Sequence, residues 1–156
     1  MKRLILNLLE EMQEKIQTLG IDIQLEKDLS PLKRQVTVKN LVSPNAIAVL
    51  PMEGCDCNPD GSPSELAERR YLRFAAGGAG LIWWEDCSVV PEGRANPLQM
   101  MLTKENAGQF ADLLKRANEA AKDANGENHR PINILQLTHS GRYSRPEGYK
   151  MSSIIP

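Results

Sequence analysis

The sequence predicts an α/β fold in which short parallel strands alternate with helices. Three apolar runs, at 46–50, 80–84 and 132–137, are short and do not alternate with polar residues, which is typical of strands covered on both faces of a parallel sheet. A stretch of helical periodicity separates each run from the next. Such strand–helix–strand units form right-handed crossovers, so we expect a parallel sheet.

The two intervening helices carry recognisable start and stop signals. At 62–65 the order Ser-Pro-Ser-Glu predicts a helix with Ser62 as its cap, Pro63 in the first position and Gly77 at its end. Thr103 is expected to cap the longer second helix. The apolar stripe of that helix is Phe110, Leu113, Leu114, Ala117 and Ala121.

The segment before the first apolar run is expected to form a helix and two short strands outside the parallel sheet. Apolar residues at spacings of three and four predict an amphipathic helix from Leu4 to Leu19 that ends at Gly20. A packing helix or an extra arm is favoured over a partner-binding element. Alternating residues predict a short strand at 21–28 and an exposed strand at 35–40.

Composition limits the classes of function. The chain has 156 residues, the length of one ordinary domain, and a formal net charge of -1, so there is no electrostatic case for nucleic acid or an anionic membrane as a partner. We find no signal peptide and no run long enough to span a bilayer. Three cysteines argue against a disulfide scaffold and predict a cytoplasmic protein.

Polar residues gather where the apolar runs end, which is where α/β proteins place their ligands. The run Cys55-Asp56-Cys57 lacks a second ligand pair, so no metal site is predicted. Gln136 either reads the edge of a heterocycle or satisfies loop backbone, and the residues alone favour neither. His139 and Arg142 either bind an anion or pack against Glu85 or Asp86, and packing is favoured for Arg142.

Four stretches carry a resemblance to a known family: 29–52, 60–85, 91–100 and, most specifically, the Gln-Leu-x-His-x-Gly-Arg run within 134–146. On these motifs the chain resembles the old yellow enzyme family of FMN-dependent NAD(P)H oxidoreductases. The resemblance implies two regions: an N-terminal helical extension at 1–28, and the N-terminal portion of an FMN-binding TIM barrel at 29–156.

The resemblance also implies a site. In the family's (β/α)₈ barrel FMN lies across the mouth. By position, Pro51, Met52 and Glu53 would line the flavin from the first strand, Asp86 would lie beside the ring, and Gln136 would hydrogen-bond its pyrimidine edge. NAD(P)H is the implied reductant and a small molecule, such as an activated alkene, the implied acceptor. The main catalytic residues are expected beyond the end of the chain.

Two positions depart from the family pattern. Glu53 stands where the family usually has Thr or Cys, and Asp86 where it usually has a small residue. Two carboxylates beside a flavin would disfavour its anionic reduced form, and so lower its potential or weaken its binding. Alternatively, the match is shifted by one residue at either position.

The sequence holds about three barrel strands, whereas the family barrel has about 250 residues. We therefore expect the first part of a larger enzyme, inactive alone, with either the remainder of the barrel or a second copy as partner. The alternative is a stand-alone partial barrel that self-associates and has a structural or ligand-binding role without catalysis. A different TIM-barrel enzyme is disfavoured by the Gln-Leu-x-His-x-Gly-Arg run.

Overall fold

A computed structural model describes residues 9–148 of the chain. The chain divides into two compact units between Pro31 and Leu32. Within residues 9–148, no helix combines the length and the apolar character that a membrane crossing requires.

The N-terminal unit contains helix α1, Leu9–Leu19. The helix predicted over Leu4–Leu19 is thus confirmed from Leu9 onward, while positions 4–8 lie outside the described residues. Gly20 ends the helix with φ +63°, and Ile21 N–H donates to the Ile16 carbonyl at 3.1 Å. The strand predicted at 21–28 is wrong, because alternation makes a strand only where a neighbouring strand accepts its backbone hydrogen bonds.

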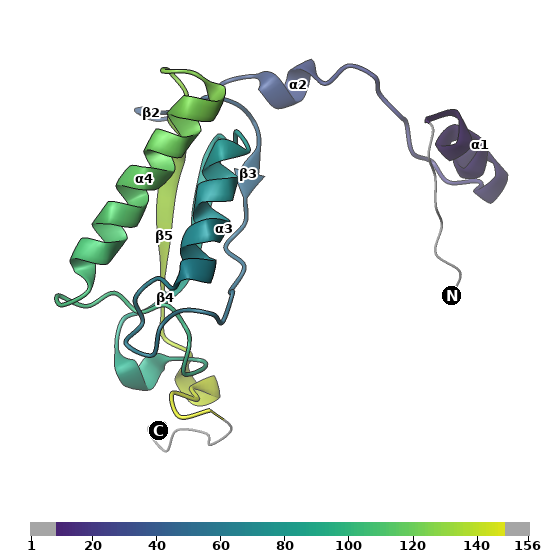
Figure 1. The fold of residues 1–156 in the computed structure, drawn as a ribbon. Helices are drawn as coiled ribbons and strands as arrows, with labels where there is room; N and C mark the ends of the chain where they lie inside the picture. The colour runs from purple at the N-terminus through teal and green to yellow at the C-terminus, as the bar shows by residue number, and fades with distance from the viewer. Residues whose placement is uncertain (1–8, 149–156) are drawn as a thin grey trace. The chain divides into compact units, whose positions relative to one another are not determined.

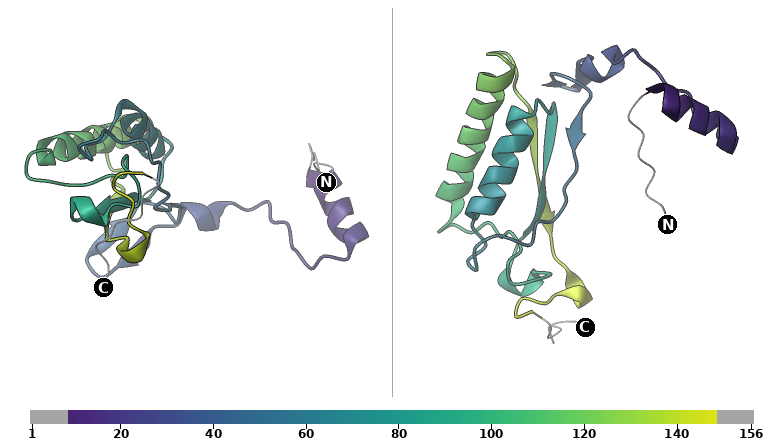
Figure 2. Two further views of the ribbon diagram at one scale, coloured as in Figure 1. Left: turned by 90° about the horizontal axis from the view of Figure 1, so that it is seen from below. Right: turned by 45° about the vertical axis from the view of Figure 1, so that its right-hand side comes forward.

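The second unit is built on a parallel sheet, as predicted. Its strands are β3 (Ala48–Val49), β4 (Leu81–Ser88) and β5 (Ile132–Thr138), in the order β3-β4-β5. Helices α3 (Glu65–Ala76) and α4 (Ala107–Asn125) lie side by side on one face of this sheet (Figures 1 and 2). Strand β4 continues to Ser88, so the polar residues expected just after it belong to the strand itself.

The chain also contains several shorter elements. The strand expected at 35–40 is present as β1 (Val36–Val38), and it pairs antiparallel with β2 (Leu41–Ser43) in a separate hairpin. Helix α2 (Ser30–Lys33) precedes the hairpin. Two 3₁₀ turns, η1 (Pro91–Gly93) and η2 (Gly141–Tyr143), lie in the segments that follow β4 and β5.

Both helix caps differ from the predicted ones. Helix α3 is capped by Ser64, whose Oγ accepts from Ala67 N–H at 3.2 Å, and not by Ser62. The Ser62 hydroxyl instead donates to Asp60, in the turn before the helix. Helix α4 begins after Asn106 rather than directly after Thr103. Several capping residues stand close together at both starts, and the hydrogen bonds each one makes decide the boundary.

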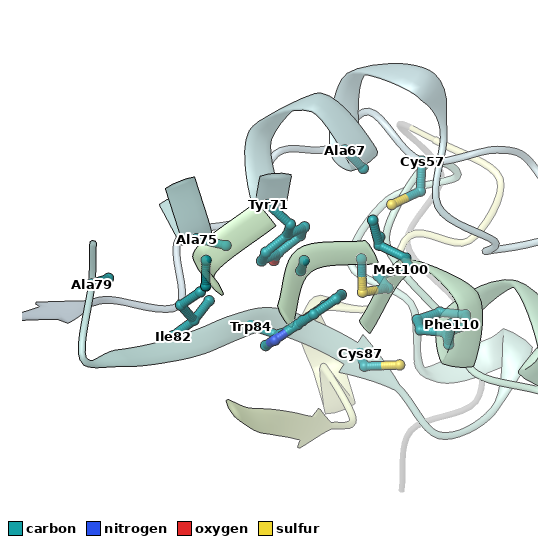
Figure 3. Packing of buried hydrophobic residues seen from close by; sticks show 13 residues of the cluster. Cys57, Ala67, Tyr71, Ala75, Ala79, Ile82, Trp84, Cys87, Met100 and Phe110 are labelled. Carbon is teal, nitrogen blue, oxygen red and sulfur yellow. The ribbon is translucent and has the colours of Figure 1, made fainter. Parts of the chain in front are cut away.

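The core lies between the two helices and the sheet. The rings of Tyr71 on α3 and Trp84 on β4 are stacked, with centroids 4.1 Å apart and an angle of 11° between the planes (Figure 3). Burying a large apolar side chain of this kind stabilises the fold by about 1.5–3 kcal/mol. Small residues complete the packing and let the helices approach closely: Ala67, Ala75, Ala79, Ala117 and Ala121 are all buried.

Within residues 32–148, no α-helix covers the opposite face of the sheet. We call it the open face. Leu81 pairs with Ala48 and with Ile132, while Ile82, the next residue along β4, is buried toward the helices. Because side chains alternate along a strand, Leu81 and Trp83 belong to the open face. The Trp83 side chain is 39% exposed there.

Candidate functional site

The site is positioned by an irregularity near the end of β4. Trp84 pairs with Leu135 and Cys87 pairs with Leu137, so two residues of β4, Glu85 and Asp86, stand opposite the single residue Gln136 of β5. This is the arrangement of a β-bulge, which bends a strand and re-aims its side chains. Glu85 is buried on the helix side, and Asp86 is directed to Gln136.

Glu85 accepts hydrogen bonds from three residues. Its Oε2 accepts from Gly54 N–H at 2.9 Å, and its Oε1 accepts from Arg70 Nη2 at 2.5 Å and from the Tyr71 hydroxyl at 3.2 Å. The Tyr71 oxygen in turn accepts from the backbone N–H of Glu85 at 2.8 Å. A buried carboxylate needs such partners, since an unpaired charge is costly to bury. The network joins α3, β4 and the loop after β3.

Arg70 completes the network by binding a second carboxylate. Its Nη1 and Nη2 donate to Asp56 at 2.6 and 3.0 Å. Asp56, Cys57 and Glu85 place ligand atoms within 4.8 Å of one another. However, Arg70 already binds both carboxylates, and burial raises the pKa of the Cys57 thiol to about 12. The carboxylate oxygens of Asp56 and Glu85 thus already have partners within the protein.

Asp86 and Gln136 contact each other directly on the open face. The Gln136 side-chain amide donates to Oδ1 of Asp86. Gln136 is half-buried and lies on β5 two residues before Thr138, the last residue of the strand. Asp86 on β4 and Gln136 on β5, both predicted from the sequence as site residues, are thus in contact.

Glu53 lies near the same pair, in the loop that follows β3. Burial raises the pKa of its carboxyl above the ordinary value, and the charges of Asp86 and Glu85 raise it further, while the Gln99 amide acts in the opposite direction. Gln99 is itself buried, and its Nε2 makes no hydrogen bond of ordinary geometry. Carboxylates from β4 and from the loop after β3 therefore converge on one small region.

The other two residues assigned to the first strand lie beside Glu53 in the chain. Pro51 is half-buried, and Met52 is 75% exposed. Met52 N–H donates to the Leu50 carbonyl at 2.9 Å, which turns the chain sharply away from β3. Strand β3 is shorter than the apolar run at 46–50, and these residues belong to a loop.

Arg142 does not pack against either acidic residue, contrary to the prediction. Its Nη2 donates to the Tyr143 hydroxyl at 3.0 Å, and both side chains are exposed. The His139 ring accepts from Gly141 N–H through Nδ1 at 3.0 Å. Turn η2 explains the difference, because it carries the chain away from the end of β5.

Sequence reasoning missed three contributors: Arg70, Tyr71 and Gln99. Arg70 and Tyr71 were assigned only to a helix, and Gln99 only to a loop. Helical periodicity offered a partial signal for Arg70, since it neighbours the core residue Tyr71 and borders the buried face of α3. Nothing in the sequence near Gln99 distinguishes it from a solvated amide.

No family model matches the chain, and no curated protein matches it either. Solved structures do match. Morphinone reductase is 27% identical, with a TM-score of 0.56 over 77% of this chain and 30% of that chain. The old yellow enzyme from Trypanosoma cruzi is 23% identical, with a TM-score of 0.57 over 76% of this chain and 29% of that chain.

A third match, 2-naphthoyl-CoA reductase, has a TM-score of 0.62 at 19% identity, over 75% of this chain and 17% of that chain. The chain thus spans less than a third of the length of each of these structures. Its fold is that of a part of these oxidoreductases. The predicted resemblance of this chain to the old yellow enzyme family is confirmed.

Proposed function

We propose that this chain is part of an FMN-dependent oxidoreductase and contributes the end of a barrel sheet on which the flavin ring rests. One observation carries the proposal: Gln136 presents its amide at the carboxyl end of a parallel strand, in a fold matched to old yellow enzymes. The chemistry that FMN supplies when bound is hydride transfer from NAD(P)H to a small acceptor such as an activated alkene.

The residues of the site suit a planar heterocycle. Leu50, Met52 and Trp83 expose apolar surface at or near the open face, on which a ring can lie. A side-chain amide combines a donor and an acceptor, as does the pyrimidine edge of a flavin, so Gln136 would orient the ring. Pro51 and Glu53 would border it from the loop after β3, and Asp86 from β4.

Two arginines near the strand ends, Arg70 and Arg94, are already engaged with protein groups. Arg70 binds two carboxylates, and Arg94 donates to the carbonyls of Pro59 and Gln99 at 2.7 and 2.5 Å. Neither guanidinium is available to anchor a phosphate. These residues therefore favour recognition of the ring, with the phosphate held by other parts of a complete barrel.

The test is a titration of the full chain with FMN and, separately, with riboflavin, followed by quenching of flavin fluorescence. We expect saturable binding with similar dissociation constants for the two ligands, since the phosphate has no anchor among these residues. Gln136→Leu should weaken binding of both ligands by about tenfold, the value of one lost hydrogen bond to a ligand.

The matched control is Gln109→Leu, which changes an exposed glutamine on α4 away from the strand ends. It should leave both dissociation constants unchanged, and circular dichroism should show both variants folded. Equal binding by wild type and Gln136→Leu would refute the role given to Gln136. No flavin binding by a folded chain would refute the proposal for this chain alone.

The open face favours a second candidate function, a partial barrel that associates with another copy or with the remainder of a barrel. Leu50, just after β3, is 66% exposed, and Trp83 on β4 is 39% exposed on a face that no α-helix of residues 32–148 covers. Apolar surface of this kind marks interaction sites. Light scattering during size-exclusion chromatography distinguishes the cases: an oligomer without flavin affinity supports the structural role.

A further inference from the structure

The bulge in β4 gives its two acidic residues separate surroundings. Glu85 has its charge balanced by Arg70 and its oxygens bound by Gly54 and Tyr71. Asp86, the next residue, contacts Gln136 on the other side of the strand. Only Asp86 is therefore placed where it meets a ligand that approaches Gln136.

The Asp86–Gln136 contact uses the donor half of the glutamine amide. Gln136 Nε2 donates to a carboxylate, and hydrogen bonds to ionised acceptors are among the stronger ones in proteins. A ligand whose acceptor atom needs that N–H must displace Asp86. The Oε1 acceptor of Gln136 has no such competitor in this contact.

Charge adds to this competition. Asp86 lies close enough to Glu53 for its charge to raise the pKa of that carboxyl. A ligand that brings a negative charge or a carbonyl dipole to Gln136 therefore meets two carboxylates. The competition for the Gln136 N–H and the repulsion by the carboxylates both disfavour a ligand that presents acceptor atoms at this position.

We infer that Asp86 is a specificity-determining residue that competes with the ligand for the Gln136 amide and so limits flavin affinity. This inference rests on the proposed function and deepens it. Asp86 selects against ligands that present only acceptor atoms to Gln136, and it favours those that also offer an N–H to its carboxylate. Removing the side chain frees the amide and removes one negative charge from the site.

Two substitutions separate the two effects. Asp86→Ala removes both the charge and the acceptor, whereas Asp86→Asn removes the charge and keeps a carbonyl oxygen that can accept from Gln136. In FMN titrations of the full chain, we expect Asp86→Ala to bind about tenfold more tightly than wild type, and Asp86→Asn to fall between them. In a Gln136→Leu background the gain from Asp86→Ala should be smaller.

The control for charge is Asp123→Ala, which removes an exposed carboxylate from α4 and should not change affinity for FMN. A second measurement needs no ligand. In heteronuclear NMR spectra, the Gln136 side-chain amide protons should shift toward unbonded positions in Asp86→Ala and remain unshifted in Asp123→Ala.

The outcomes are distinct. Tighter binding by Asp86→Ala, together with the amide shift, supports the inference. If wild type and Asp86→Ala bind FMN with equal affinity, the inference is overturned and the proposed function stands. An unshifted amide overturns it as well. No binding by any variant overturns both the inference and the flavin proposal for this chain.

Discussion

Nη2 of Arg70 lies 2.5 Å from Oε1 of Glu85, whose side chain is fully buried. Arg70 also binds Asp56, and the Glu85 carboxylate accepts from Gly54 in the loop after β3. The Arg70–Glu85 pair joins helix α3 to strand β4. Asp56 and Gly54 connect this pair to the loop that contains Glu53. The geometry of the candidate site therefore depends on this buried pair.

Replacing Arg70 with Met is expected to lower the free energy of unfolding by about 3 kcal/mol, since it leaves the buried Glu85 charge without its cation. The partial exposure of Arg70, at 23%, keeps the loss at the lower end of the range for broken buried pairs. Urea denaturation measures it. Arg69→Met, an exposed neighbour on α3, is the control and should cost less than about 0.5 kcal/mol. Equal losses in the two variants would show that the pair is not stabilising.

Tyr71→Phe tests the hydroxyl in the same network without disturbing the stack on Trp84. The backbone N–H of Glu85 loses its acceptor, and one oxygen of its carboxylate loses a donor. A buried polar group left without a partner costs about 1–3 kcal/mol, which urea denaturation resolves. Tyr143→Phe, at an exposed position, should change stability by less than about 0.5 kcal/mol. A loss no larger than that of the control would contradict the network.

Because of Glu53, we expect the stability of the folded chain to depend on pH. Its folded pKa is raised above the ordinary value of 4.5, so the folded chain holds its proton to higher pH than the unfolded chain does. Stability therefore falls as pH rises from about 4.5 through the folded pKa, and the penalty is complete above it. Glu53→Gln removes this penalty. The variant should be more stable than wild type at about pH 7 and equal to it at about pH 4.

Chemical denaturation of both proteins at the two pH values measures this effect, with Glu105→Gln, at an exposed position, as the control. The control should differ from wild type equally at both pH values. A stability difference between Glu53→Gln and wild type that does not change with pH would show that the surroundings of Glu53 do not disfavour its charge.

Local patterns predicted most of the fold of residues 32–148. The short apolar runs and the helices between them were correctly placed, because burial on a parallel sheet leaves a pattern in neighbouring residues. The predictions were wrong where adjacent residues in the sequence do not determine the backbone hydrogen bonds. The strand at 21–28 has no pairing strand, and the caps Ser64 and Asn106 compete with Ser62 and Thr103 for the same role.

By itself, the sequence predicted a parallel α/β sheet with Glu53, Asp86 and Gln136 near the carboxyl ends of its strands, and it indicated the family that the fold resembles. Only the tertiary structure decided what those side chains contact. The bulge opposite Gln136 sends Glu85 to Arg70 and Asp86 to Gln136, although the two are adjacent in sequence. Strand register is a relation between segments about 50 residues apart, and no pattern within either segment encodes it.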